Sequence, residues 1–158
     1  NETEVRTIEP LAIKESKERW YIIGNDHKLD KGLRAFGFDR ISAVTYFGIN
    51  FSPKYTLNEI KAKYDSLFAM FDTENKEVEE IILEFDKRDG NYINSFPIHH
   101  SQMIEKTENG VRVTLKLKTT PDFIMEIMSR AWSLNVVKPV SLRHEVSKIL
   151  KDAYLRNQ

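Results

Sequence analysis

The sequence feature that most constrains the fold is a strict alternation of side chains that follows an Asn-Gly pair. Between residues 111 and 118, apolar and polar side chains take turns: Val111, Val113, Leu115 and Leu117 alternate with Arg112, Thr114, Lys116 and Lys118. A period of two is typical of a strand with one buried face. Asn109-Gly110 stands directly before this run, and Asn-Gly favours the tight turn of a β-hairpin. We therefore predict a hairpin with strands over residues 102–106 and 111–118.

The rest of the C-terminal half predicts an α+β module around this hairpin. The expected elements are a strand over Val78–Phe85 ended by Lys87–Gly90, a short helical turn over Tyr92–Phe96, a helix from Thr120-Pro121 to Trp132, a short strand at Val136-Val137, and a last helix capped by Ser141. Proline at the first helical position and Ser or Thr at the cap are the usual signs of a helix start. The order β-(α)-β-β-α-β is that of a ferredoxin-like split βαβ unit with an extra terminal helix.

The N-terminal third reads as short strands. Arg19–Ile23 is rich in β-forming residues and is followed by Gly24–Asp26, which we interpret as a turn. Lys28–Gly32 reads as an exposed loop. Residues 34–47 are again rich in aromatic and β-branched residues, with interruptions at Gly37 and at positions 42–43. Short strands with short connections predict a small, strongly curved sheet or barrel over roughly residues 1–55.

A change of period at residue 56 marks a connecting helix. Thr56 and Glu59 match the capping box, and the apolar side chains that follow at helical spacing predict a helix over residues 57–71. Residues 72–77 are polar and charged, which is typical of a linker. The expected fold class is therefore α+β, with one domain over residues 1–73 and a second over residues 78–158.

Composition excludes several classes of protein. The chain has 24 basic and 24 acidic residues and a formal net charge of +0, which argues against a surface built as a whole for DNA. It has no cysteine, and this excludes disulfide scaffolds, thiolate zinc sites and cysteine nucleophiles. No stretch approaches the ~20 apolar residues of a membrane span, and no charged and apolar leader opens the sequence. We expect a soluble, cytoplasmic protein with no membrane partner.

An ordered set of motifs resembles a known family. Pro10-Leu11, then Trp20–Gly24, then Arg34–Ile41 resembles the signature of WYL domains, with Ile22 in place of the third signature residue. The downstream segment with Pro97–Gln102, the hairpin and a last helix is similar to the C-terminal extension that follows such domains. The resemblance implies an SH3/Sm-like β-barrel followed by a ferredoxin-like extension, as found in bacterial transcription regulators.

The resemblance also implies a larger context. In that family a winged helix, a further helix and a strand precede this region, so we read the chain as a piece of a longer regulator. Operator DNA is then expected to be contacted only through an N-terminal domain outside the sequence. The regulators of this family act as dimers, which implies a homodimer here, and the apolar stripes of residues 60–71 and 123–132 are candidates for its interface as well as for the core.

Two arginines are the main candidates for ligand binding. In a regular strand, Arg34, Phe36, Phe38 and Arg40 share one face. The two arginines then stand about 20 Å apart, which is too far for one phosphate but suits successive phosphates of a bound strand. A bulge or bend at Gly37 would instead bring them closer or move one of them to the other face. Guanidinium groups suit phosphate oxygens, and aromatic rings between them suit bases. The alternative is an ordinary surface ion pair of Arg40 with Asp39, or of Arg34 with a glutamate.

The resemblance favours the ligand-binding interpretation, because the matching arginines of WYL proteins belong to a ligand-binding surface. We expect Arg34, Arg40, Tyr21 and Phe36 to bind an anionic ligand, either single-stranded nucleic acid or a nucleotide, with Lys14 as a possible further contact. Trp20 and Tyr21 point to opposite faces of their strand, and we expect Trp20 in the core with Ile22 and Tyr21 on the outer or ligand side.

Two other classes of function compete with this one. His99, His100 and Ser101 suggest a hydrolase, but adjacent histidines on a strand point apart and no Gly-x-Ser-x-Gly motif occurs. His27 and His144 are expected to be solvated. We therefore predict no enzyme, no metal and no cofactor. The other alternative is a dimerisation scaffold that binds no ligand.

Overall fold

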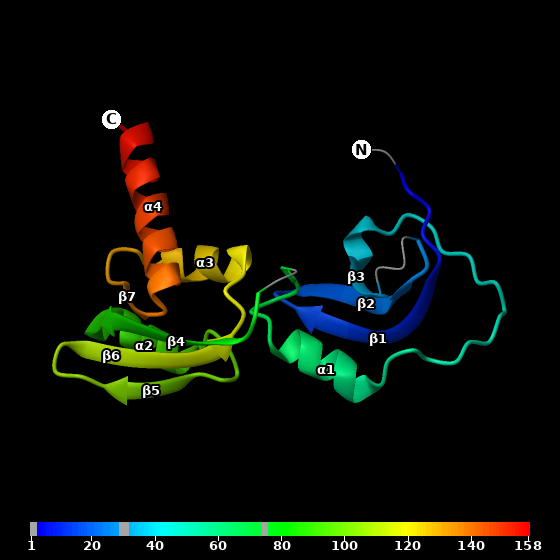
Figure 1. Cartoon of the computed structure of the whole chain (residues 1–158), viewed down its shortest axis with the longest axis horizontal. Helices are drawn as coiled ribbons and strands as arrows, with labels where there is room; N and C mark the ends of the chain where they lie inside the picture. Colours follow the sequence, from blue (N-terminus) through cyan, green and yellow to red (C-terminus); the bar gives the residue numbers. More distant parts are fainter. Residues whose placement is uncertain (1–2, 29–31, 74–75) are drawn as a thin grey trace. The chain divides into compact units, whose positions relative to one another are not determined.

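The computed structural model describes residues 3–28, 32–73 and 76–158, and its elements are labelled in Figure 1. The chain divides into two compact units, Asn1–Tyr64 and Asp65–Gln158. Each unit has its own antiparallel sheet, so the α+β class is confirmed. The division falls before the expected linker because the segment after residue 64 packs with the second unit. Lys118 N donates to Ser66 O (2.9 Å), and the Phe68 ring meets the edge of Phe123 at a centroid distance of 6.0 Å.

The first unit is built on a three-stranded sheet in the order β1-β2-β3. The strands are β1 (Ile8–Ser16), β2 (Arg19–Asp26) and β3 (Gly32–Gly37), and both pairings are antiparallel. Over the described part of this unit, the sheet is not closed into a barrel, so the expected barrel is not confirmed.

Three boundaries in this unit differ from the sequence prediction. Residues 24–26 continue β2 instead of forming a turn, because they pair with β1 on one side and with β3 on the other. β3 ends at Gly37, and Phe38–Arg40 form a 3-10 helix (η1). Residues 41–53 have no regular structure, whereas a β-run was expected to continue to residue 47. Of the predicted loop Lys28–Gly32, residues 29–31 lie outside the described residues.

Helix α1 (Leu57–Asp65) begins as the sequence predicts and ends earlier. Its capping box is confirmed. Thr56 N donates to Glu59 Oε2 (2.7 Å) and Glu59 N donates to Thr56 Oγ1 (3.3 Å). The helix stops at residue 65 instead of 71 because the next residues turn toward the second unit, where Ser66 accepts the hydrogen bond from Lys118. Within the predicted linker, residues 74–75 lie outside the described residues.

The second unit has the predicted order of strands and helices. Its elements are β4 (Glu79–Asp86), α2 (Lys87–Ser95), β5 (Met103–Lys106), β6 (Gly110–Leu117), α3 (Pro121–Met128), β7 (Asn135–Lys138) and α4 (Val140–Arg156). The sheet order is β5-β6-β4-β7, and every neighbouring pair is antiparallel. The hairpin predicted from Asn109-Gly110 is confirmed as the pair β5–β6.

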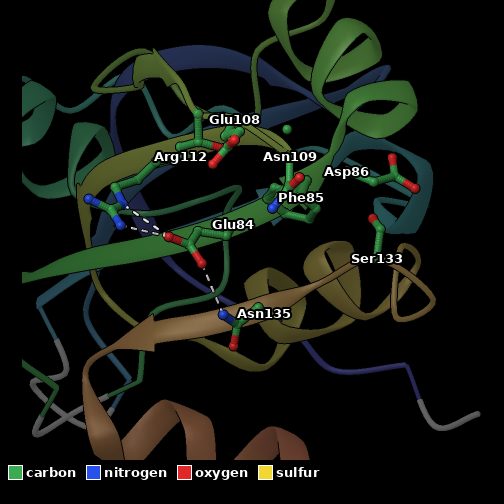
Figure 2. A pocket seen from close by; sticks show the side chains of 10 residues that line it. Glu84, Phe85, Asp86, Glu108, Asn109, Arg112, Ser133 and Asn135 are labelled. Carbon is green, nitrogen blue, oxygen red and sulfur yellow. Dashed lines mark hydrogen bonds and ion pairs between the residues drawn. The ribbon is translucent and has the colours of Figure 1, made fainter.

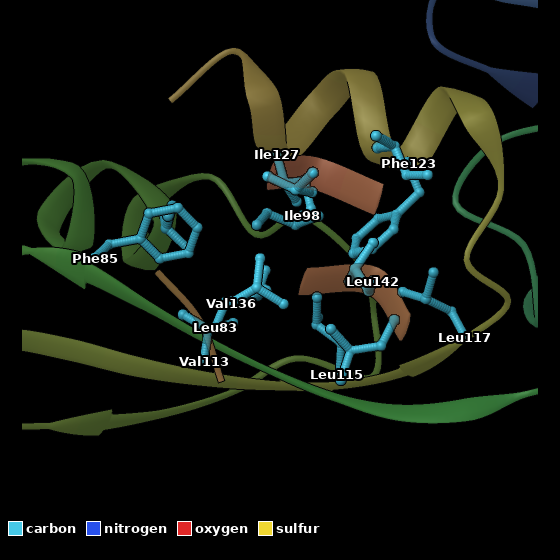
Figure 3. Close-up of a cluster of buried hydrophobic side chains, with 14 of the residues drawn as sticks. Leu83, Phe85, Ile98, Val113, Leu115, Leu117, Phe123, Ile127, Val136 and Leu142 are labelled. Carbon is cyan, nitrogen blue, oxygen red and sulfur yellow. The ribbon is translucent and has the colours of Figure 1, made fainter. Parts of the chain in front are cut away.

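The buried face of this sheet carries the main hydrophobic core (Figure 3). The predicted alternation is confirmed, because Val113, Leu115 and Leu117 are fully buried. Ile81, Leu83 and Phe85 of β4 lie beside them, and Phe123 and Ile127 of α3 cover them. The opposite face is polar, with Arg112 Nη2 bonded to Glu84 Oε1 at 2.7 Å.

The helices of this unit differ from expectation at their ends. Lys87–Gly90, expected to end a strand, form the first turn of α2, because the Asp86 side chain caps the helix by accepting from Asp89 N (2.8 Å). α3 ends at Met128 instead of Trp132, and residues 129–134 form turns. α4 begins at Val140 after Pro139, and Ser141 lies inside it and does not cap it.

Candidate functional site

The register of β2 and β3 divides the predicted site residues between two faces of the first sheet. Residues paired directly across an antiparallel sheet have side chains on the same face, and neighbours along a strand alternate. Arg34 pairs with Gly24 and Phe36 pairs with Ile22, so Arg34 and Phe36 share a face. Tyr21 pairs with Gly37 and therefore lies on the other face.

Arg40 lies with Tyr21 and not with Arg34. The prediction that Arg34 and Arg40 share a strand face is wrong, because β3 ends at Gly37 and Arg40 belongs to η1. A Cβ atom placed on Gly37 would lie 3.5 Å from Arg40 Nε and 3.6 Å from Tyr21 Cε1. The nearest atom to this position is Asp39 Oδ1, at 2.6 Å, so Arg40, Tyr21 and the Asp39 carboxylate all lie beside this glycine.

Two further cations belong to the face of Tyr21. Lys14 of β1 pairs directly with Tyr21. Arg19 precedes Tyr21 by two residues on β2 and has the same parity; its Nη1 is 3.9 Å from Asp39 Oδ2. We call Lys14, Arg19, Tyr21 and Arg40 the Tyr21 cluster. Among the described residues, these three cations share this side of the sheet with the Asp39 carboxylate, which lies beside both Arg19 and Arg40. Arg19 was missed from the sequence, although its parity with Tyr21 was a usable signal.

Arg34 is partly compensated by a buried acid. Asp26 is 1% exposed, and its carboxylate accepts from Arg6 Nη1 (3.0 Å) and Lys28 N (3.0 Å). Arg34 Nη1 is 3.9 Å from the same carboxylate, and the Arg34 side chain is 41% exposed. Phe36, on the same face, is half-buried. Arg34 therefore keeps donors that face solvent while Asp26 neutralises part of its charge.

Trp20 is exposed, which corrects the expectation that it is buried with Ile22. Its exposure is 55%, whereas Ile23, on the other face, is 1% exposed and takes the core position. The face of Trp20 also leaves Ile13 of β1 61% exposed. The core of this unit therefore lies on the side of Ile23 and Tyr21.

His99 and Ser101 are joined in a structural network. His99 Nδ1 is 2.8 Å from Ser101 Oγ, and His99 Nε2 is 3.1 Å from Asp65 O. Ser101 Oγ also accepts a hydrogen bond from Lys116 N (2.9 Å). Burial, together with the neighbouring His100, lowers the pKa of His99 below its ordinary value. The pair connects the last residue of α1 to β6, and the Ser101 hydroxyl is bonded to backbone. The expectation that the two adjacent histidines point apart is wrong, because residues 99 and 100 are not in a strand and their ring centroids lie 4.0 Å apart.

A pocket of about 360 Å³ lies at one end of the second sheet (Figure 2). Glu84, Asp86 and Glu108 line it, with Arg112 and Asn135. Hydrogen bonds from Arg112, and a further one from Asn135 Nδ2 (3.0 Å), lower the pKa of Glu84. Three carboxylates against one guanidinium make this pocket unsuited to an anion.

Neither a metal centre nor a membrane span is found in the described ranges. Among these residues, no three His, Asp or Glu side chains are arranged to hold a metal ion. No helix formed by them has the length and apolar character needed to cross a bilayer.

Comparison with known proteins identifies both units. The family model of the WYL domain matches residues 1–46, and that of the WCX domain matches residues 77–154. No curated protein matches the chain. Among solved structures, the chain is similar to proteasome accessory factor B/C (PafBC) of Arthrobacter aurescens, with 17% sequence identity and a TM-score of 0.41. The match covers 96% of this chain and 22% of the PafBC chain, so this chain spans about a fifth of that protein's length.

Proposed function

The chain belongs to the WYL-domain family of regulatory proteins, and we propose that it is the ligand-sensing region of a bacterial transcription regulator. Its ligand is anionic, either single-stranded nucleic acid or a nucleotide. The observation that carries this proposal is the Tyr21 cluster, in which Lys14, Arg19 and Arg40 lie on the same side of the sheet as one half-buried aromatic ring.

The edge of the first sheet brings the predicted residues within reach of one ligand. Among the described strands, β3 pairs with β2 alone and is an edge strand, and Lys63 Nζ of α1 donates to Leu33 O near its start (3.5 Å). Arg34 and Phe36 lie on one side of this edge, and Tyr21 and Arg40 lie on the other. A strand that runs along β3 contacts both pairs. The guanidinium groups hold its phosphates, and Tyr21 or Phe36 offers a ring on which a base stacks.

We propose the two named folds for the two units. The element order β-α-β-β-α-β and the sheet order β5-β6-β4-β7 support a ferredoxin-like second unit. The WYL match over residues 1–46 supports a small SH3/Sm-like barrel to which β1, β2 and β3 contribute.

In this proposal the chain acts through a larger cytoplasmic regulator. Operator DNA is bound by an N-terminal domain outside this sequence, and ligand occupancy shifts that domain between two arrangements of different affinity. The regulator is a homodimer. Exposed apolar side chains on the last turns of α4 support an interface there: Ile149 is 36% exposed, Tyr154 66% and Leu155 56%.

Thermal denaturation tests the ligand class. A ligand that binds only the folded state stabilises it by about 2.7 kcal/mol at a hundredfold excess over Kd. We expect oligothymidylate, single-stranded RNA or a nucleotide to raise the Tm of the wild type, and Arg40→Ala to reduce the shift. Arg112→Ala, which removes an exposed ion pair with Glu84 on the second sheet, is the matched control and keeps the full shift. If every such ligand leaves the Tm unchanged while the protein is a tight dimer, the chain is a dimerisation scaffold.

A further inference from the structure

A second surface of arginines and aromatic rings lies on the second unit, where α2 meets the turns after α3. The residue at its centre is Asp89, which is buried, with 4% of its surface exposed. Asp89 Oδ2 accepts a hydrogen bond from Trp132 Nε1 (2.8 Å) and another from Ser133 Oγ. Asp89 Oδ1 is 3.8 Å from Arg88 Nε and 3.8 Å from Arg130 Nη1. One buried carboxylate thus holds the Trp132 indole by a hydrogen bond and lies near two arginines.

The rings held by this network are open to solvent. Tyr92 is 51% exposed, Phe96 is 64% exposed and Trp132 is 68% exposed. The Arg130 guanidinium lies 4.2 Å from the centroid of the Tyr92 ring, and that of Arg88 lies 5.5 Å from the Trp132 ring. The centroids of the Tyr92 and Phe96 rings are 6.2 Å apart. Exposed aromatic rings cost free energy in water, so a fixed group of them indicates a binding surface.

Among the residues that the structure describes, the carboxylates paired with the Arg88 guanidinium lie beyond hydrogen-bond distance. Its side chain is 71% exposed, and the carboxylate oxygens paired with it, on Asp86 and Asp89, are 4.0 and 3.8 Å away. These distances exceed that of a hydrogen bond. Lys87, also exposed, adds another cation. The charge and the geometry therefore suit a phosphate beside an aromatic ring.

We propose that Arg88, Tyr92, Arg130 and Trp132 form a second contact surface for single-stranded nucleic acid. Trp132 and Tyr92 stack on bases, and Arg88 binds a phosphate between them. The inference adds a site in the second unit to the ligand class of the proposed function, but it rests on separate residues. A protein partner would also use Trp, Tyr and Arg. The open donors of Arg88, next to rings that are already oriented, favour a polyanion with stackable bases.

The two tryptophans of the chain allow each surface to be observed alone. In the Trp20→Phe variant, Trp132 is the only tryptophan of the chain and reports on the second unit. In the Trp132→Phe variant, Trp20 is the only tryptophan and reports on the first unit. Each single-tryptophan protein is titrated with an oligothymidylate of about 12 nucleotides. We expect saturable quenching of Trp132 fluorescence, because a stacked base quenches indole emission.

Affinity is measured in parallel by fluorescence anisotropy of a labelled oligothymidylate. Arg88→Ala and Trp132→Ala are each expected to weaken binding about tenfold, the effect of losing one phosphate contact or one stacked base. Arg88 is exposed, so its variant keeps the fold even if Trp132→Ala disturbs Asp89. Tyr46→Ala, which removes an exposed ring that belongs to neither surface, is the matched control and leaves affinity unchanged.

The outcomes separate this inference from the proposed function. If oligothymidylate binds and Arg40→Ala weakens it while Trp132 fluorescence does not change, the second surface is wrong and the proposed function stands. If Trp132→Ala and Arg88→Ala weaken binding while Arg40→Ala does not, the second surface stands and the Tyr21 cluster is wrong. An emission of Trp132 that depends on protein concentration and not on oligonucleotide indicates a protein interface and overturns the inference.

Discussion

Gly110 begins β6 at a position where a side chain has no room. A Cβ atom there would lie 1.9 Å from Phe85 O, and a backbone carbonyl of the paired strand cannot move aside. We predict that Gly110→Ala lowers the free energy of unfolding by about 3 kcal/mol through overpacking. Glu108→Ala changes an exposed residue of the same turn and is expected to stay within about 0.5 kcal/mol of the wild type. Urea denaturation measures both, and equal stability of Gly110→Ala and wild type contradicts the close approach of β4 and β6.

The tautomer of His99 is fixed by two backbone groups. Asp65 O can only accept, so Nε2 carries the proton, and Ser101 N can only donate, so Nδ1 accepts at 3.2 Å. Protonation of Nδ1 would turn this acceptor into a donor that faces another donor. Burial and His100 lower the pKa of His99 in the folded state, in agreement with a neutral ring.

The lowered pKa of His99 predicts a loss of stability in mild acid. The unfolded histidine has a pKa of about 6.5. Above that value both states are neutral at His99 and the stabilisation is complete. Below it the unfolded state binds the proton first, so stability falls as the pH drops toward the pKa of the folded state. His99→Gln should reduce the difference in unfolding free energy between about pH 8 and about pH 5. His100→Gln should retain most of it, and an unchanged difference in His99→Gln would show that other groups cause it.

Single residues also show where sequence reasoning stops. Tyr21, Arg34, Phe36 and Arg40 were selected from the sequence, but their faces depend on where β3 ends. Gly37 was recognised as a possible bend, and period two alone cannot decide between a bend and a continued strand. Trp20 was expected inside because large aromatic rings usually are, and the register places Ile23 there instead.

At the scale of elements, the β1–β2 hairpin uses an unfavourable turn. Lys17 and Glu18 form its two-residue connection with φ values of 50° and 62°. Hairpin turns with both residues in this region favour Asn-Gly, because other side chains crowd the backbone there. We predict that Lys17→Asn with Glu18→Gly raises the free energy of unfolding by about 1 kcal/mol.

A matched substitution distinguishes turn geometry from a general effect of glycine. Glu105→Gly in β5 changes an exposed strand residue and is expected to lower stability by about 0.5–1 kcal/mol. If the Asn-Gly variant of the first hairpin is also less stable than wild type, the backbone strain that we assign to Lys17 and Glu18 is wrong.

Elements with local signals were predictable, and those set by pairing were not. The Thr56–Glu59 box, the Asn109-Gly110 turn and the proline at the start of α3 each have a signal in adjacent residues. The C-terminal ends of α1 and α3 have no such signal in the adjacent residues. They depend on Ser66 reaching Lys118 and on Trp132 reaching Asp89, partners that lie far away in the sequence.

At the scale of the whole molecule, the two units are expected to unfold separately. Each has its own sheet, and each contains one tryptophan, Trp20 or Trp132. The single-tryptophan variants report one unit each, and we predict urea transitions with different midpoints. Leu83→Ala creates a cavity in the second core and should lower only the Trp132 transition, by about 3 kcal/mol. Coincident transitions that shift together in Leu83→Ala would show one cooperative unit.

The net charge of the chain does not predict where the candidate site lies. A net charge of zero excluded a uniformly basic surface, and it is compatible with a local one. Lys14, Arg19 and Arg40 come from β1, β2 and η1, and only the pairing of these elements places them around Tyr21. Net charge does not contain that information, and the spacing of residues along the sequence contains it only for Arg19, which has the same parity as Tyr21 on β2.

The salt dependence of oligonucleotide binding tests the central claim most directly. Anisotropy titrations of oligothymidylate compare wild type, Arg34→Ala and Arg40→Ala at about 0.05 M and about 0.2 M salt. Each arginine that binds a phosphate releases counterions, so its loss should weaken binding and reduce the slope of log K against log salt by about 0.7. We predict this result for Arg40→Ala, and a smaller loss of affinity for Arg34→Ala because Asp26 already neutralises part of its charge. If both variants bind as tightly as wild type with the same slope, these arginines are structural and the proposed site is wrong.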